Sequence, residues 1–235
     1  MYPYIKKNLN FKKHVLIFTI ICIVISIFIY FLTQKYLIKP RKNISIQNLI
    51  PYLHDAKKEL RVAKQSIPAS TQGLEYNINF WMFLNDYTYR MNQDKVIVQK
   101  GEGNIVNPVI LLEKNSNNLK IKVSTSYFNS HDETQNNMVD DMEVDEHEEF
   151  IVNNIKLQRW TNINITFVDN SIDVYLNGKL VNSFILKGFP KINSGGLVIT
   201  PNGGFNGRIS NLLYTNKGFS FKKIYSIYKN GPEHF

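Results

Sequence analysis

The feature that most constrains this chain is an uninterrupted apolar run near its N-terminus. Residues 15–32 read VLIFTIICIVISIFIYFL, 18 residues without a charge, in which Thr19 and Ser26 are only mildly polar. A helix over this run is about 27 Å long, close to the roughly 30 Å hydrocarbon core of a bilayer. The run exceeds a usual signal-peptide core, and no small-residue cleavage site follows it. The sequence therefore predicts a single-pass transmembrane helix over residues 15–33, with Val15 and Leu32 near its ends, behind a short basic tail of residues 1–14.

The net charge of +9 belongs to the region around this run. Residues 1–67 hold 12 Lys and Arg against two acids, whereas residues 68–235 hold 16 against 17. Basic residues beside an apolar run are typical of contact with anionic lipid head groups, so a lipid bilayer explains the charge and no nucleic-acid partner is expected. The basic residues are balanced on the two flanks, which leaves the orientation open. The single cysteine, Cys22, lies inside the run, so the rest of the chain cannot form an internal disulfide.

Residues 34–66 are expected to form a basic linker or stalk. Within it, Pro51–Lys64 resembles a short helix with a proline near its start. The alternative is a helix that packs on the domain that follows.

From Leu74 onward the apolar residues recur with period two, which is typical of strands. Tyr76, Ile78 and Phe80 fall on one face of a half-buried strand, and Asn77, Asn79 and Trp81 fall on the other. Further strand-like runs cover residues 95–100, 108–113, 119–128 and 160–186, with hairpin turns at Asp169-Asn170 and Asn177-Gly178. Ser220 and Gly231 can bound a short closing helix. Residues 67–235 are therefore predicted to form a mainly β, antiparallel sandwich with a short C-terminal helix.

From about Ile67 to Pro232 the chain resembles the laminin-G-like, concanavalin A-like lectin–glucanase superfamily. The residues that carry the resemblance are LQRWTNINITFVDNSIDVYLNGKLVNSF, ITPNGGFNGRISNLLYTN and SIYKNGP. It is most similar to versions in large double-stranded DNA viruses, through IPAS, NFWMFLNDYTYR, NPVILLE and TPNGGFNGRISN in the same order. The resemblance implies an antiparallel jelly-roll β-sandwich. It also implies carbohydrate, protein or lipid ligands, with glycoside hydrolases among the relatives, so the fold alone does not choose a function.

A catalytic candidate lies in EVDEHE, where Glu143, Asp145 and Glu148 match the E-x-D-x-x-E pattern of laminarinase-type glycosidases. In such enzymes one Glu is the nucleophile and the other the general acid. The motif lies in an acidic tract, residues 132–149, whose nine carboxylates match such a spacing by chance. Like-charge runs of this kind favour a solvated loop, so no enzymatic activity is expected.

Other candidate sites rest on single residues. The acidic tract could hold Ca²⁺, but it shows no recognisable loop motif. Asp169 could likewise be a Ca²⁺ ligand, with an ordinary turn residue as the alternative, and no cofactor is expected. Asn43 and Asn164 begin N-glycosylation sequons. Tyr87, Tyr89 and Arg90 follow the first strand of the domain and could stack on a sugar or anchor a protein, with strand packing as the alternative. Trp160 is expected in the core.

Together these patterns predict a membrane-anchored, non-enzymatic recognition or structural module. Its expected partners are a lipid bilayer and a glycan or neighbouring protein, and its expected place is a virion membrane or a capsid–membrane interface. The alternatives are a membrane-tethered glycoside hydrolase that uses Glu143 and Glu148, and a cellular adhesion module.

Overall fold

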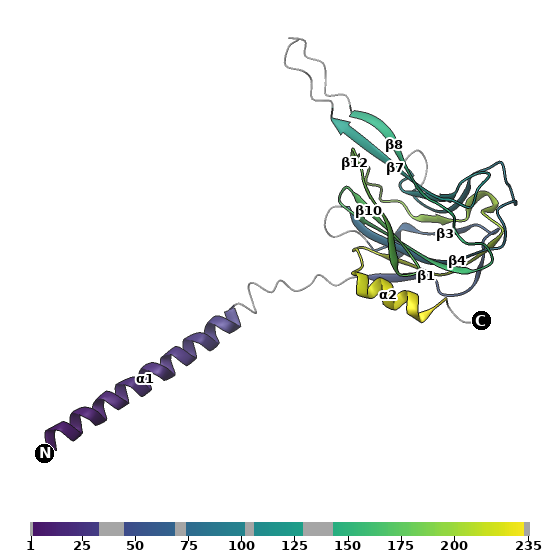
Figure 1. The fold of residues 1–235 in the computed structure, drawn as a ribbon. Helices are drawn as coiled ribbons and strands as arrows, with labels where there is room; N and C mark the ends of the chain where they lie inside the picture. The colour runs from purple at the N-terminus through teal and green to yellow at the C-terminus, as the bar shows by residue number, and fades with distance from the viewer. Residues whose placement is uncertain (1, 33–44, 69–73, 102–105, 129–142, 233–235) are drawn as a thin grey trace, which may run out of the picture. The chain divides into compact units, whose positions relative to one another are not determined.

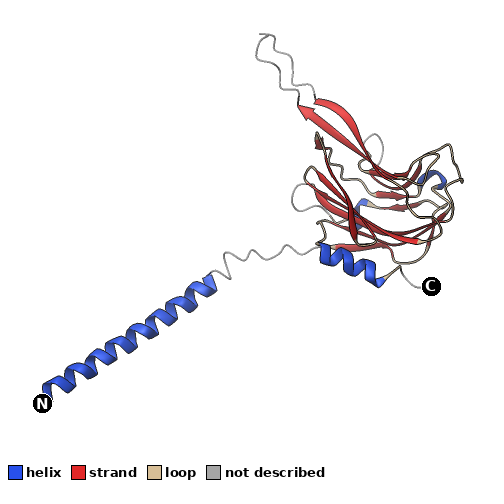
Figure 2. Cartoon of the chain, viewed as in Figure 1, coloured by secondary structure: helices blue, strands red, loops and turns tan. Residues whose placement is uncertain are grey.

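The structure is a computed structural model, and it describes the backbone of residues 2–32, 45–68, 74–101, 106–128 and 143–232. Side chains are described for residues 14–30, 45–68, 74–101, 106–126 and 147–232. The chain divides into two compact units, Met1–Asn43 and Ile44–Phe235. Figure 1 follows the chain by element, and Figure 2 shows that strands dominate the second unit.

The first unit contains one helix, α1 (Tyr2–Leu32), which begins well before the predicted start at residue 15. Its described apolar side chains are exposed, from Val15 at 48% to Phe18 at 68%. Within the part of the chain that the structure describes, no helix has the length and apolarity of a membrane span.

The second unit is a sandwich of two sheets, each with seven strands. The first sheet has the order β1-β14-β4-β9-β10-β11, with β2 also paired to β14; the second has the order β12-β7-β6-β5-β13-β3, with β8 also paired to β7. All these strand pairs are antiparallel. The predicted antiparallel sandwich is therefore confirmed.

The bounds of the elements are as follows. The first sheet contains β1 (Ile46–Ile50), β2 (His54–Asp55), β4 (Glu75–Leu84), β9 (Trp160–Val168), β10 (Ser171–Leu176), β11 (Lys179–Ile185) and β14 (Gly207–Thr215). The second contains β3 (Leu60–Val62), β5 (Lys95–Lys100), β6 (Val109–Leu112), β7 (Leu119–Phe128), β8 (Glu143–Val152), β12 (Phe189–Pro190) and β13 (Leu197–Ile199). Two short 3-10 turns, η2 (Lys64–Ser66) and η3 (Pro201–Gly203), and the helix α2 (Phe221–Asn230) complete the unit.

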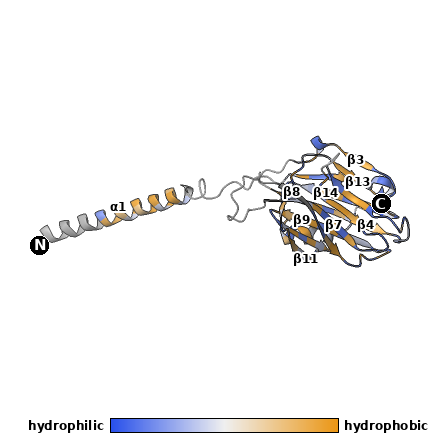
Figure 3. Cartoon of the chain, turned by 90° about the horizontal axis from the view of Figure 1, so that it is seen from above, coloured by the Kyte–Doolittle hydropathy of each residue, from blue (hydrophilic) through white to orange (hydrophobic). Residues whose placement is uncertain are grey.

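The main core lies between the two sheets. On β4, alternate residues Tyr76, Ile78, Phe80 and Met82 enter it, as the period of two predicts. Figure 3 shows hydrophobic residues along the strands that form this core. Each fully buried aliphatic or aromatic side chain stabilises the fold by about 1.5–3 kcal/mol relative to an exposed one. All described residues of this core, from Leu49 to Tyr214, and both sheets lie within Ile44–Phe235, so this unit has a hydrophobic core of its own, as a domain that can fold alone requires.

The opposite face of β4 is also buried, so the prediction of a half-buried strand is wrong. Asn77 and Asn79 are fully buried, and Trp81 is 4% exposed. Asn79 exchanges amide hydrogen bonds with Asn162 on β9, at 3.3 and 3.2 Å, and Thr166 donates to the Asn77 Oδ1 at 2.7 Å. Hydrogen bonds among the side chains stabilise this buried polar layer, although the Asn77 Nδ2 and the Trp81 Nε1 have no partner among the described residues.

The helix α2 supplies cover for this face of the first sheet. It begins after Ser220 and ends before Gly231, as the sequence predicted, although the Ser220 hydroxyl makes no capping bond. Ile224 and Ile227 are buried with Phe219 in a second, smaller core. The ring of Tyr228 stacks on Trp81 at 5.9 Å between centroids.

Residues 46–62 form strands of the sandwich, so the prediction of a helix over Pro51–Lys64 is wrong. β1 and β2 pair with β14, and β3 pairs with β13. Ile50 and Ala56 are fully buried in the main core. Pairing with distant strands outweighs the weak local helix signal of this segment.

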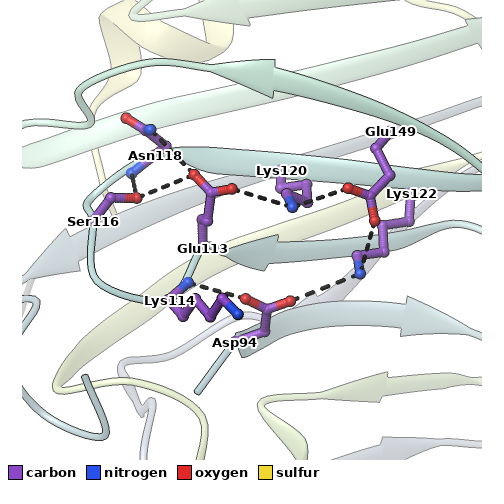
Figure 4. A network of polar contacts seen from close by, with 8 residues as sticks. All are labelled: Asp94, Glu113, Lys114, Ser116, Asn118, Lys120, Lys122 and Glu149. Carbon is purple, nitrogen blue, oxygen red and sulfur yellow. Dashed lines mark hydrogen bonds and ion pairs between the residues drawn. The ribbon is translucent and has the colours of Figure 1, made fainter. Parts of the chain in front are cut away.

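The outer face of the second sheet carries a network of ion pairs (Figure 4). Lys120 bonds Glu113 at 3.1 Å and Glu149 at 2.9 Å, and Lys122 bonds Glu149 at 2.9 Å and Asp94 at 3.7 Å. The network joins the start of β5, the β6–β7 turn, β7 and β8.

Candidate functional site

The three acidic positions of the E-x-D-x-x-E motif, 143, 145 and 148, lie on one strand, β8. This strand pairs with β7 without a register shift from Leu119↔Val152 to Phe128↔Glu143. Because successive residues of a strand alternate between faces, positions 143 and 145 fall on one face and position 148 on the other. The Glu148 carboxylate accepts backbone N–H bonds from Lys187 at 3.0 and 3.1 Å and from Gly188 at 3.1 Å. A glycosidase needs both carboxyl groups beside one glycosidic bond, so this arrangement does not support that alternative.

The sequence predicted that the acidic tract is a solvated loop, and for its second part this prediction is wrong. Residues 143–149 are strand, and residues 132–142 lie outside the described residues. The reason is that Phe150 and Val152 alternate with the acids and pack into the core.

Three further candidates rest on single residues, Asp169, Asn164 and Asn43. Asp169 lies exposed in the β9–β10 turn with a φ of 51°, and among the described residues there is no group of three or more metal-ligating side chains. Asn164 is fully buried and donates to the Thr166 Oγ1 at 3.1 Å, which leaves no room for a glycan in the folded domain. Asn43 lies outside the described residues.

Tyr87, Tyr89 and Arg90 are half-buried in the loop after β4. Asp86 orders this loop, because its carboxylate accepts the Thr88 hydroxyl at 2.8 Å and the backbone N–H groups of Thr88 and Tyr89 at 3.0 and 3.1 Å. The Thr88 hydroxyl, followed by the Tyr89 N–H and the Asn206 amide, lowers the pKa of Asp86 from its usual value. The Lys57 ammonium lies 4.9 Å from the centre of the Tyr89 ring.

The TPNGGFNG loop packs against this aromatic loop. Asn85 donates its backbone N–H to the Asn206 carbonyl at 2.9 Å, and Asn206 donates to the Asp86 carboxylate. The TPNGGFNG loop contains the short 3-10 turn η3 and leads directly into β14. Thr200 is buried with a φ of 48°, a left-handed conformation that is a genuine outlier for a β-branched residue.

A polar cavity of about 490 Å³ opens beside these loops, and we call it the loop-end cavity. Its described lining residues are Leu53, Asp55, Lys57, Asn85, Asn206, Gly207 and Arg208. The predicted aromatic residues neighbour this cavity and do not line it.

A larger concavity, of about 690 Å³, lies on the outer face of the first sheet beside α2, and we call it the aromatic groove. Its described lining residues are Trp81, Phe83, Lys156, Gln158, Arg159, Trp160, Thr161, Asn177, Tyr228 and Lys229. Trp160, expected in the core, is half-exposed here. It pairs across the sheet with Phe83, and their rings meet edge to face at 5.5 Å.

The groove combines flat rings with amides and positive charge. Lys156, Arg159 and Lys229 are exposed, and the described lining residues include no carboxylate. Aromatic faces stack on the apolar faces of sugar rings, and amide and cationic groups bond hydroxyl and acidic substituents. Sequence reasoning missed this groove because it depends on where α2 ends on the sheet.

Comparisons with known proteins bear on the fold. No family model and no curated protein matches the chain. The binding domain of botulinum neurotoxin serotype D matches with a TM-score of 0.56 and 12% identity, over 80% of this chain and 47% of that chain.

Two further solved structures are binding domains of botulinum neurotoxin DC. The domain in complex with SialylT matches with a TM-score of 0.54 and 13% identity, and the domain in complex with rat synaptotagmin II with 0.54 and 14%. Each match covers 80% of this chain and 46% of the toxin domain, so this chain spans about half the length of these structures. At this identity the likeness shows the fold alone: an antiparallel β-sandwich shared with toxin receptor-binding domains. The similarity to viral proteins stays a prediction.

Proposed function

We propose that the chain is a non-enzymatic recognition module that binds a glycan in the aromatic groove. The observation that carries the proposal is the groove itself, where Phe83, Trp160 and Tyr228 leave aromatic surface accessible between amide and cationic side chains. Two toxin domains with this fold were solved with SialylT and with a protein, which supports a recognition role for a sandwich of this kind.

The charge of the groove favours an acidic glycan over a neutral one. Lys156 and Arg159 form no ion pair with any described residue, so their charges are available to a carboxylate. We therefore expect sialyllactose to bind more tightly than its neutral parent lactose, and added salt to reduce this difference.

The test is isothermal titration of both sugars into the purified chain and into three variants. Trp160→Ala and Phe83→Ala remove the stacking surface and are expected to weaken sialyllactose binding at least tenfold, equivalent to about 1.4 kcal/mol. Phe189→Ala removes an aromatic side chain that is 66% exposed on β12 of the second sheet, and it is the matched control. Unchanged binding by Trp160→Ala, or no binding of either sugar by the unaltered protein, would refute the proposal.

As a further part of this function, the N-terminal helix holds the module at a membrane as a single-pass anchor. One support is the uncharged run, which continues to Leu32, two residues beyond the last described side chain of α1. The other is that the described apolar side chains are exposed on all sides of this helix. In alkaline carbonate the full chain should stay with membranes, and a variant without residues 15–32 should be released. Release of the full chain would contradict the anchor.

The place of the module is a virion membrane or a capsid–membrane interface, and the support is the order of viral-type segments from IPAS to TPNGGFNGRISN. Purified particles should contain the chain, and protease treatment of intact particles would report the side on which the sandwich lies. Finding the chain only on cell surfaces would instead favour the adhesion module.

A further inference from the structure

A third cavity, of about 400 Å³, lies at one end of the sandwich and is separate from the aromatic groove; we call it the inter-sheet cavity. Tyr76 from β4 and Tyr214 from β14 line it, and their rings stack at 5.9 Å with an interplanar angle of 14°. Both tyrosines are buried. The cavity therefore reaches from the surface to the aromatic part of the core.

The walls of the inter-sheet cavity are largely apolar. Ile67 and Leu74 line it and are half-buried. Ile192 also lines it and is 73% exposed, more than any other large apolar side chain among the described residues. Apolar surface left in water at the edge of a cavity favours a ligand with an apolar body.

Three lysines line the cavity, and two of them, Lys64 and Lys100, have only neutral partners among the described residues. The Lys100 ammonium donates to the backbone carbonyl of Asn193 and, at 3.2 Å, to its side-chain Oδ1. Lys64 donates to the Ser194 hydroxyl at 3.1 Å. The described lining residues include no carboxylate. Burial, and then the charge of Lys64, lowers the pKa of Lys100, so the two ammonium groups lie close enough to repel each other.

The wall that carries these contacts is held in place before any ligand arrives. The Asn193 amide donates to the carbonyls of Lys100 at 2.9 Å and Asn107 at 2.7 Å. Its Oδ1 accepts the Gly195 N–H at 3.0 Å. A wall fixed in this way loses little conformational freedom on binding.

We propose that the inter-sheet cavity binds an anionic amphiphile, with the anionic group between Lys64 and Lys100 and the hydrocarbon chain against Tyr76, Leu74 and Ile192. The anion would relieve the repulsion between the two ammonium groups, and the chain would cover the exposed apolar side chains. A cavity of this volume lies within the usual range for small-molecule sites. The site is independent of the glycan groove, which lies on the outer face of the first sheet.

The experiment titrates decanoate and the uncharged decanol into the sandwich domain, residues 44–235, which contains the hydrophobic core described above. Decanoate is expected to bind saturably at one site, at least tenfold more tightly than decanol. Lys100→Met and Lys64→Met keep most of the side-chain volume, remove one charge each, and are expected to weaken decanoate binding at least tenfold while leaving decanol binding in place. Lys179→Met, at an exposed position on β11, is the matched control.

Thermal unfolding of each variant shows first that it is folded, and Lys64→Met, at an exposed position, provides a second test if Lys100→Met destabilises the domain. No saturable decanoate binding, equal affinity for decanol, or unchanged affinity in both folded lysine variants would overturn the proposal.

Two sources of such a ligand can be told apart with vesicles. If the anionic amphiphile is a membrane lipid, the domain should bind vesicles that contain phosphatidylserine and not vesicles of phosphatidylcholine alone, and decanoate should compete. If it is a free fatty acid, decanoate should bind and neither type of vesicle should. Binding to phosphatidylserine vesicles that decanoate does not displace and that Lys100→Met leaves unchanged would place lipid contact elsewhere and count against this cavity.

Discussion

Trp81 on β4 and Tyr228 on α2 stack with their ring centroids 5.9 Å apart and their planes 22° from parallel. This contact fastens the C-terminal helix to the outer face of the first sheet, and both residues also line the aromatic groove. The attachment of the helix and the shape of the proposed glycan site therefore depend on the same pair of rings.

Removing the Tyr228 ring should loosen α2. Stacked aromatic pairs contribute about 0.5–1.5 kcal/mol beyond the area that they bury, so Tyr228→Ala is expected to lower the free energy of unfolding by about 1–3 kcal/mol in a urea titration. Phe221→Ala removes a ring from the same helix at a position 57% exposed and should cost much less. Equal losses in the two variants would show that the stacking contact does not fasten the helix.

The buried asparagine layer makes a second prediction about stability. In Asn79→Ala, the side-chain oxygens of Asn162 and Asn164 lose the Asn79 amide that donates to them, while both stay buried. A buried polar group left without a partner costs about 1–3 kcal/mol, and the free energy of unfolding should fall by about that amount. Asn153→Ala, at an exposed position before β9, is the control and should be nearly neutral. If both variants unfold at the same urea concentration, the layer does not stabilise the sheet.

The ion-pair network on the second sheet predicts how stability depends on pH. Bonds from Lys122 and then Lys120 hold the pKa of Glu149 below its usual value of 4.5, and the bond from Lys120 does the same for Glu113. As the pH falls, the unfolded chain takes up these protons first, so the stabilisation is present above about pH 4.5 and is lost as the pH falls through the folded pKa values.

The stabilisation that Lys120 contributes to the network is lost at high pH instead of low pH. Bonds to Glu149 and Glu113 raise the pKa of Lys120 above its usual 10.5, so its contribution is present below that pH and is lost as the pH rises through the folded pKa.

Urea midpoints measured from pH 3 to 7 should fall less steeply for Glu149→Gln than for the unaltered domain. An identical acid slope would mean that the network does not couple to folding.

The turn beside the loop-end cavity should tolerate no side chain at Gly204. Its φ is 39°, and an added Cβ would lie 2.2 Å from the Ala56 carbonyl oxygen. Gly231 has a φ of 78°, a ψ of 177° and open space around it, so Gly231→Ala incurs only the backbone strain of this glycine-type conformation, about 1–3 kcal/mol. Gly204→Ala should lower the melting temperature by clearly more than Gly231→Ala. The reverse order would contradict the close approach of the Gly204 turn to the Ala56 carbonyl.

Local patterns in the sequence predicted much of the sandwich. The runs Lys95–Lys100 and Leu119–Phe128 coincide with β5 and β7, because alternation of apolar residues is a local property of a half-buried strand. The turns at Asp169 and at Asn177-Gly178 have the positive φ values that the residue types predicted. Fold class and hairpins could therefore be predicted without tertiary information.

What the sequence did not predict depends on distant partners. β1 and β2 exist because β14 pairs with them, and β8 continues through an acidic run because β7 lies beside it. The groove was missed for the same reason: Trp160 and Tyr228 are 68 residues apart, and only the docking of α2 brings them to one concavity.

The most direct test of glycan recognition uses the fact that the chain has two tryptophans, Trp81 and Trp160. In a Trp81→Phe variant, which keeps an aromatic ring against Tyr228, all tryptophan emission comes from Trp160 in the aromatic groove. The proposed function predicts that sialyllactose changes this emission saturably, with the affinity found by calorimetry, and that lactose does so more weakly. Emission that stays constant while sialyllactose binds, or no binding of sialyllactose at all, would contradict it.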